Sequence, residues 1–142
     1  MERMQSQDRG PGAGQPITIV MYHAVSDVPG PYTVSPSAFR RQVEAIASSF
    51  RVIGLRSVPR ELEARWSSER RVVLTFDDAF VDFAESAFPI LEELGLRSTV
   101  FVPTGHVGGH NAWDEGLSGW RRRPVLDAAG LRGLHATGLV RQ

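Results

Sequence analysis

The chain has 142 residues, of which 42% are hydrophobic and 23% charged, a composition suited to one small domain with a buried core. Its sixteen basic and sixteen acidic side chains give a formal net charge of zero, which argues against nucleic acid or an anionic membrane surface as a partner. Cysteine does not occur, so disulfides and thiolate metal sites are excluded, and any metal must be bound by oxygen and imidazole.

Residues 1–16 are rich in glutamine, glycine, proline and charge, and we expect a disordered leader there, followed by one domain over residues 17–142. The leader lacks the apolar stretch of a signal peptide or a membrane anchor, and no later run is long enough for a transmembrane helix. With no export signal visible, a cytoplasmic location is the default expectation.

Residues 17–21 form a short apolar run that predicts a strand, and Tyr22 and His23 lie at its carboxyl end. A single histidine in such a place is usually a hydrogen-bonded structural residue. An imidazole also suits proton transfer, because its ordinary pKa of about 6.5 lies close to neutral pH. The residues alone leave both roles open for His23.

A helix is predicted to follow a turn-rich loop, with Ser35 as N-cap and Pro36 as its first helical residue. Apolar residues at helical spacing continue it to about Phe50. A strand over residues 51–55 and a short helix over residues 57–66 come next.

The stretch 71–82 carries the strongest chemical signal. Its apolar run predicts a buried strand that ends at two adjacent acids, Asp77 and Asp78. Acids at the carboxyl end of a parallel strand lie where α/β folds place their chemistry. Neighbouring strand residues point to opposite sides, so unless the chain turns there, one acid could bind a metal while the other accepts a proton. The simpler alternative is that one of them caps the next helix.

The remaining pattern predicts a helix over residues 80–94, interrupted by Pro89, a strand over residues 97–102, and a helix capped by Asp127. Another strand is expected to begin at Leu139. This alternation of strands and helices predicts a parallel sheet with right-handed crossovers.

The long loop over residues 103–124 is a candidate functional segment. His106 and His110 have the spacing of paired metal ligands, but that spacing requires a helix, and the two glycines between them argue against one. Trp113 and Trp120 could line a sugar-binding groove, with ordinary packing as the alternative.

Several segments in this order resemble the first half of a polysaccharide deacetylase domain, also called the NodB homology or carbohydrate esterase family 4 type. They are MYHAV at residues 21–25, TFDDAF at 75–80, FPIL at 88–91, STVFV at 98–102 and NAWD at 111–114. The usual family motif is TFDDG, so Ala79 is a departure. The resemblance implies a distorted (β/α) barrel with parallel strands, of which the C-terminal half is missing here.

The resemblance further implies a hydrolase that removes N-acetyl groups from an amino-sugar polysaccharide or oligosaccharide with one divalent metal, zinc being the first candidate. By motif position, Asp77 matches the catalytic base, Asp78 a metal ligand and His23 the general acid. Asn111 and Trp113 are predicted to bind substrate.

The family's pair of histidine ligands has no counterpart in this sequence, so we expect weak metal binding and little activity from these residues alone. The open barrel edge would favour self-association. One alternative is a non-catalytic remnant that binds glycan or a partner chain. A magnesium-dependent phosphotransferase is the least favoured alternative. Such enzymes usually carry Asp-x-Asp after the strand, whereas Asp77 and Asp78 are adjacent.

Overall fold

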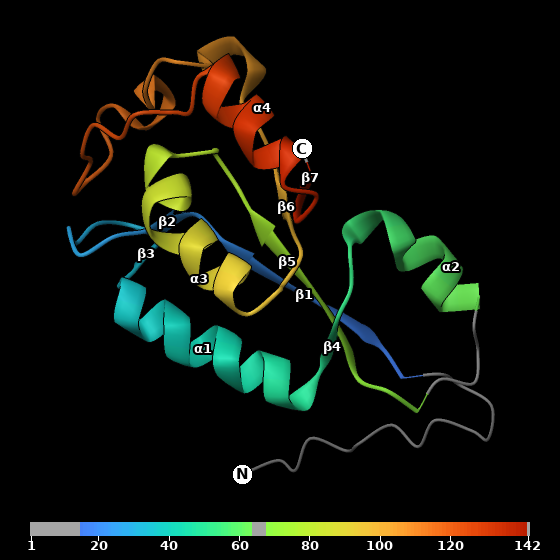
Figure 1. The fold of residues 1–142 in the computed structure, drawn as a ribbon. Coiled ribbons are helices and arrows are strands. Elements are labelled where there is room, and N and C mark those ends of the chain that lie inside the picture. The colour runs from blue at the N-terminus through green and yellow to red at the C-terminus, as the bar shows by residue number, and fades with distance from the viewer. Residues whose placement is uncertain (1–14, 64–67, 142) are drawn as a thin grey trace, which may run out of the picture.

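The computed structural model describes residues 15–63 and 68–141, and Figure 1 shows their fold. The predicted disordered leader lies almost entirely outside the described residues, as does the end of the helix predicted over residues 57–66. Among the helices in the described part of the chain, none is long and apolar enough to cross a membrane.

Five parallel strands form the main sheet: β1 (Ile17–Tyr22), β4 (Arg51–Val52), β5 (Arg71–Phe76), β6 (Ser98–Val100) and β7 (Val140–Arg141). The central strand β5 pairs with β1 along its whole length, with β4 at its start and with β6 at its end. Because β1 occupies one edge of β5, β4 and β6 share the other. The parallel pairing confirms the predicted α/β class with a partial barrel sheet.

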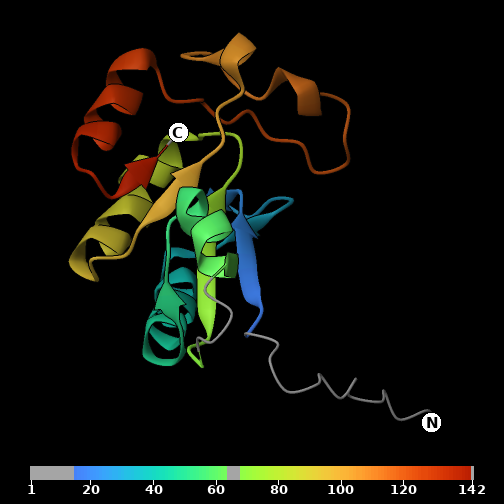
Figure 2. The same cartoon turned by 90° about the vertical axis from the view of Figure 1, so that its right-hand side faces the viewer.

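The helices α1 (Pro36–Ser49), α3 (Phe88–Glu93) and α4 (Ala128–Ala136) lie on one face of this sheet (Figure 2). The core between these layers is built on Phe76 of β5, whose ring contacts Tyr22, Phe39 and Phe83 at centroid distances of 5.4, 5.8 and 4.7 Å. Each fully buried ring of this kind contributes about 1.5–3 kcal/mol relative to an exposed one. The opposite face of the sheet carries exposed apolar side chains, namely Ile19, Met21 and Phe101.

Two predicted helix starts are confirmed by their caps. Ser35 Oγ accepts a hydrogen bond from the Ala38 N–H at 3.3 Å, with Pro36 as the first residue of α1. Asp127 Oδ1 accepts one from the Gly130 N–H at 2.8 Å and so begins α4.

The strand predicted over residues 51–55 is wrong in its length, because β4 ends at Val52 and a 3₁₀ turn follows at Leu55–Ser57. The helix α2 (Val58–Glu63) then lies beside β4 and the start of β5. Its Glu61 carboxylate binds both Arg51 and the buried Arg71 guanidinium, which joins the three elements.

The helix predicted over residues 80–94 is present from residue 81 but is not uniform. Residues 81 and 82 are α-helical, a π-helical turn, Phe83–Ala87, follows, and α3 begins after it. The Phe88 N–H donates to the Phe83 carbonyl, which shifts the ladder by one residue and places Pro89 in the first turn of α3. The N–H groups of a first helical turn have no acceptor within the helix, and proline has no N–H to place. Pro89 therefore fits after the π turn without costing the helix a hydrogen bond.

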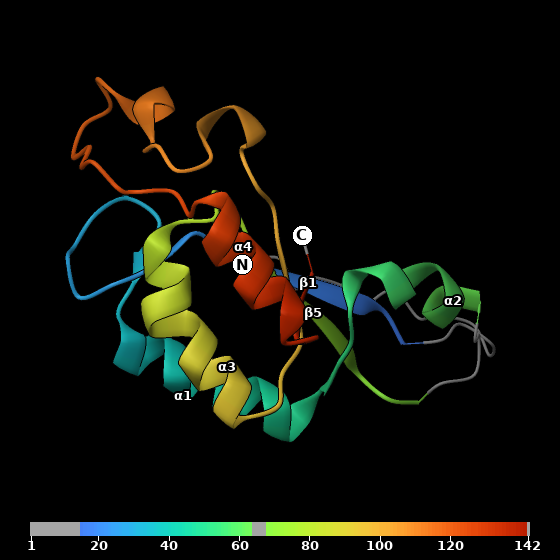
Figure 3. The same ribbon diagram turned by 45° about the horizontal axis from the view of Figure 1, so that its top comes forward.

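Two segments lie beyond the carboxyl ends of β1 and β5. One joins the short parallel strands β2 (Ala24–Val25) and β3 (Thr33–Val34), and the other is the long connection from β6 to α4 (Figure 3). Both are drawn at the same end of the sheet in all three views. They form the walls of the site described next.

Candidate functional site

His23 and Asp77 directly follow the paired strands β1 and β5. Tyr22 lies opposite Phe76 in the register, and the Asp77 N–H donates to the Tyr22 carbonyl at 2.9 Å. This brings His23 Nε2 to 3.9 Å from Asp77 Oδ2, with 22% and 30% of the two side chains exposed. The separation is longer than a hydrogen bond, and both groups are accessible to a small molecule.

The chain turns sharply at Asp78 and Ala79, whose φ angles are 71° and 48°. Both values lie in the left-handed region, where a residue with a Cβ is disfavoured by about 1 kcal/mol or more. The turn is held by a hydrogen bond from the Leu126 N–H to the Ala79 carbonyl at 2.9 Å. The glycine of the usual motif would adopt this conformation freely, so the departure at Ala79 introduces strain.

Because of this turn, the two acids face partly different surroundings. Asp77 borders the exposed apolar face of the sheet, beside Met21 and Phe101. Asp78 borders that face and also the cavity on the other side of the turn, where His23 lies. The two carboxylates thus share one environment, and Asp78 alone also borders the cavity.

Burial raises the pKa of the Asp78 carboxyl, and the neighbouring charges of Asp114 and Asp77 raise it further, while His23 acts in the opposite direction. A carboxylate in such a place favours a nearby cation. In the described part of the chain, however, no group of three or more histidine, cysteine, aspartate or glutamate side chains could hold a metal ion. The described residues therefore do not make up a complete metal site, and the assignment of Asp78 as a metal ligand stays a prediction.

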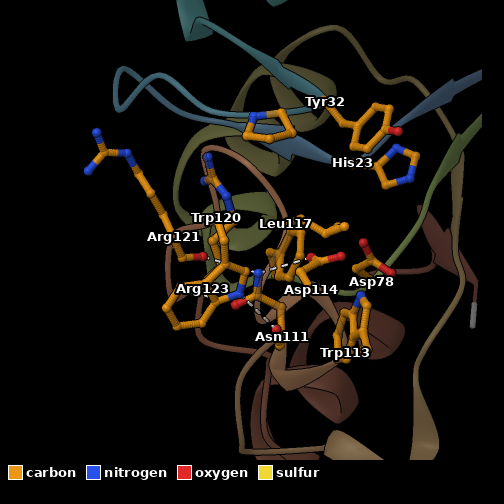
Figure 4. A pocket seen from close by; sticks show the side chains of 12 residues that line it. His23, Tyr32, Asp78, Asn111, Trp113, Asp114, Leu117, Trp120, Arg121 and Arg123 are labelled. Atoms are coloured by element: carbon orange, nitrogen blue, oxygen red, sulfur yellow. Dashed lines mark hydrogen bonds between the residues drawn. The ribbon is translucent and has the colours of Figure 1, made fainter.

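The cavity beside Asp78 has a volume of about 180 Å³ and is largely aromatic (Figure 4). Tyr32 stacks on His23 with the ring centroids 5.1 Å apart. Across the cavity, Trp113 lies parallel to Phe80 at 6.2 Å and remains 39% exposed. The indole can therefore offer surface to a ligand, as its prediction as a substrate-binding residue requires, and that prediction stays open.

Asn111 also borders the cavity, but its side chain is 3% exposed and bonded to the protein. Its Nδ2 donates to Asp114 Oδ2 at 3.0 Å and to the Arg121 carbonyl at 3.1 Å, and its Oδ1 accepts from the Arg123 N–H at 2.7 Å. Trp120 Nε1 donates to the Asn111 carbonyl at 3.2 Å. Asn111 is thus the organising residue of the loop, and it could bind a substrate only by exchanging one of these bonds.

Neither histidine of the loop is among the residues that line the cavity or the apolar face beside Asp77. His106 ends a 3₁₀ turn, Thr104–His106, and packs edge-on against Trp113 at 4.9 Å. His110 Nε2 lies 3.6 Å from Glu115 Oε1. The two do not share a helix, as the intervening glycines indicated.

Several residues of the cavity wall were not singled out by sequence reasoning, among them Tyr32, Asp114, Arg121 and Arg123. Asp114 was visible only as part of the NAWD segment. Tyr32 has a φ of 53° in a loop without periodic signal, so its approach to His23 is a product of tertiary structure.

Comparison with known proteins agrees with this geometry. The polysaccharide deacetylase family model matches residues 65–137, which is more than half of the chain. The poly-β-1,6-N-acetyl-D-glucosamine N-deacetylase of Staphylococcus aureus is 32% identical over 81 residues, covering 56% of this chain and 28% of that protein.

Two solved structures share the fold. Ammonifex degensii IcaB superposes with a TM-score of 0.71 at 22% identity, covering 90% of this chain and 52% of that one. Streptococcus pyogenes deacetylase PplD, solved in complex with acetate, gives 0.66 at 25% identity, covering 89% and 54%. This chain spans about half the length of both structures. The chain belongs to the polysaccharide deacetylase family.

Proposed function

We propose that this site removes acetyl groups from the N-acetylated amino sugars of a polysaccharide or oligosaccharide. The observation that carries the proposal is the placement of His23 and Asp77 at the ends of neighbouring strands, 3.9 Å apart and next to Asp78. Family membership supports it, as does the S. aureus relative, whose name states poly-β-1,6-N-acetyl-D-glucosamine as its substrate.

In the proposed reaction Asp77 and His23 transfer protons on the two sides of the amide. Asp77 accepts a proton from the water that attacks the acetyl carbonyl carbon. His23 donates a proton to the amide nitrogen as the carbon–nitrogen bond breaks, which releases acetate and the free amine of the sugar. Positioned proton transfer of this kind contributes about 10²–10⁴-fold each.

The family is generally metal-dependent. Asp78 is the residue that we assign to such a metal, because burial and the charges of Asp114 and Asp77 favour a cation beside its carboxylate. Zinc is the first candidate, and when bound it would polarise the acetyl carbonyl. The described residues supply no complete ligand set, so we expect this chain alone to bind the metal weakly.

The cavity supplies the surfaces that a sugar ring requires. Trp113 and Tyr32 offer aromatic faces for the apolar side of a pyranose, and Asp114 and Arg121 offer polar groups for its hydroxyls. A ring bound between them would lie next to His23 and Asp78, which border the same cavity.

One observation favours a second function, glycan binding without hydrolysis. The cavity offers the aromatic side chains of Tyr32 and Trp113 to a saccharide, whereas the described residues provide no complete metal site. A protein with this combination would bind a saccharide and leave its acetyl groups in place.

The two functions are separated by measuring acetate release from an N-acetylated chito-oligosaccharide, with and without zinc, for the wild type and Asp77→Asn. Glu92→Gln, a matched loss of one exposed acid on α3, serves as the control. We expect slow, zinc-dependent release that Asp77→Asn abolishes and Glu92→Gln preserves. Saccharide binding that neither a chelator nor Asp77→Asn alters, with no acetate formed, would establish the non-catalytic alternative.

A further inference from the structure

A partly buried ion pair borders the cavity through Arg123, outside the groups that carry the proposed chemistry. Arg123 Nη1 is 3.0 Å from Asp82 Oδ2, and the two side chains are 13% and 17% exposed. Asp82 follows the turn after β5, and Arg123 ends the long loop after β6. The pair therefore joins two of the segments that build the site.

The remaining bonds of the pair reach the third segment, residues 23–34, which carries His23 and Tyr32. Asp82 Oδ1 accepts from the Val25 N–H at 3.3 Å, two residues beyond His23. Arg123 Nη2 donates to Thr33 Oγ1 at 2.8 Å, next to Tyr32, and to the Val28 carbonyl at 3.5 Å. The ion pair thus holds the segment on both sides of the stacked His23 and Tyr32 rings.

The surroundings of Arg123 are shaped to receive it. A Cβ at Gly30 would lie 2.9 Å from Arg123 Nη2, so the guanidinium occupies space that any other residue at position 30 would restrict. The backbone of Arg123 is fixed in turn by Asn111, whose Oδ1 accepts from its N–H and whose own N–H donates to its carbonyl at 3.1 Å. One chain of contacts therefore runs from Asn111 through Arg123 to Tyr32.

Stability alone does not explain two charges in this place. Burial raises the pKa of the Asp82 carboxyl, although the Val25 N–H and Arg123 both act to lower it. Ion pairs removed from water in this way are a weak source of stability, and their better-attested use is to specify one arrangement.

We infer that Asp82 and Arg123 are positioning residues that orient His23 and Tyr32 toward the cavity. Arg123 holds the backbone around Tyr32, and Tyr32 stacks on the imidazole, so the guanidinium acts on His23 through a second ring. That the oriented imidazole serves as a general acid rests on the function proposed above. The orientation itself does not depend on that function.

The test is nuclear magnetic resonance on the 142-residue chain, reading the cross-peaks between the ring protons of Tyr32 and His23. Arg123→Gln removes the charge and the forked bonds. Thr33→Val removes the hydroxyl that Arg123 binds, together with the hydrogen bond from that hydroxyl to the Pro31 carbonyl, and leaves the ion pair intact. It keeps the test valid if Arg123→Gln does not fold. Arg122→Gln, the exposed neighbour, is the matched control.

We expect the cross-peaks to be lost in Arg123→Gln, weakened in Thr33→Val and unchanged in Arg122→Gln. Arg123→Lys should weaken them as well, because an ammonium lacks the fork that joins Asp82 to Thr33. A residue with a purely structural role would lower the free energy of unfolding and leave the cross-peaks of the folded protein unchanged.

Unchanged cross-peaks in a folded Arg123→Gln or in Thr33→Val would overturn the inference, whether or not the chain releases acetate. Absence of the cross-peaks in the wild type would also overturn the inference, because the Tyr32 and His23 rings would then not be stacked. An inactive wild type with the expected pattern in the variants would refute the proposed function alone.

Discussion

His23 and Asp77 lie 3.9 Å apart because β1 and β5 pair in register up to Tyr22 and Phe76, so that the next residue of each strand falls at the same edge of the sheet. An acceptor and a donor of protons at this separation can flank one amide. The sequence distance between them, from position 23 to position 77, is bridged by the parallel pairing and not by a local motif.

The Asp78→Asn variant tests folding stability and zinc binding independently. Burial raises the pKa of this carboxyl above its ordinary value of 3.8, so its ionisation costs folding stability. That cost is absent below pH 3.8, grows as the pH rises through the folded-state pKa and is complete above it. We expect Asp78→Asn to unfold at higher urea concentration than the wild type at neutral pH and to bind zinc more weakly. A stabilised variant with unchanged zinc affinity would remove Asp78 from the metal site.

The strained turn makes a specific prediction at Ala79, which is fully buried with a φ of 48°. Ala79→Val places a β-branched side chain in the left-handed region and overfills the core, and it should cost about 2 kcal/mol or more of unfolding free energy. Ala79→Gly relieves about 1 kcal/mol of strain and loses a methyl worth about 0.8 kcal/mol.

Ala79→Gly also gains freedom in the unfolded chain, so it should stay within about 1 kcal/mol of the wild type. Urea denaturation of both variants measures the difference. A tolerated valine at this position would mean that the left-handed turn does not form.

The fall of the unfolding free energy at acid pH should depend on Glu61. Hydrogen bonds from Arg51 and then Arg71 hold the pKa of this carboxyl below its ordinary value of 4.5. Its contribution to stability is therefore present above pH 4.5 and is lost as the pH falls through the folded-state pKa. Glu61→Gln should lower the unfolding free energy at pH 7 and flatten its fall in acid, whereas Glu92→Gln should do neither. If the unfolding free energy of Glu61→Gln falls in acid as steeply as that of the wild type, the prediction is contradicted.

Trp113 should carry a measurable part of saccharide affinity. Truncation to alanine removes an aromatic face worth about 0.5–1.5 kcal/mol beyond its buried area, which corresponds to a loss of roughly twofold to thirteenfold in affinity. Trp113→Phe keeps an aromatic face and should lose less. Titration calorimetry with an N-acetylated chito-oligosaccharide checks both variants, and equal affinity in all three proteins would place the sugar elsewhere.

The alternation of strands and helices was predictable because apolar periodicity and two helix caps, Ser35 and Asp127, are local signals. Strand geometry suggested that Asp77 and Asp78 could have separate roles, and the family motif assigned them; both roles stay predictions. The left-handed turn itself was hidden, because alanine occupies the position where glycine would have signalled it.

Other features arise only from tertiary contacts. The stacking of Tyr32 on His23 depends on a loop held by Arg123. The positions of Tyr32 and Arg123 in the sequence carry no periodic signal, so their convergence could not be predicted.

The most direct test of the account is the pH dependence of acetate release, measured with saturating zinc for the wild type, Asp77→Asn and His23→Gln. A base must be deprotonated and an acid protonated, so the wild-type rate should rise and then fall with increasing pH. Asp77→Asn should lose the rising limb and His23→Gln the falling limb, each with a loss of about 10²–10⁴-fold in rate. A falling limb that survives in His23→Gln, or a wild type that releases no acetate at any pH, would contradict the proposed division of roles.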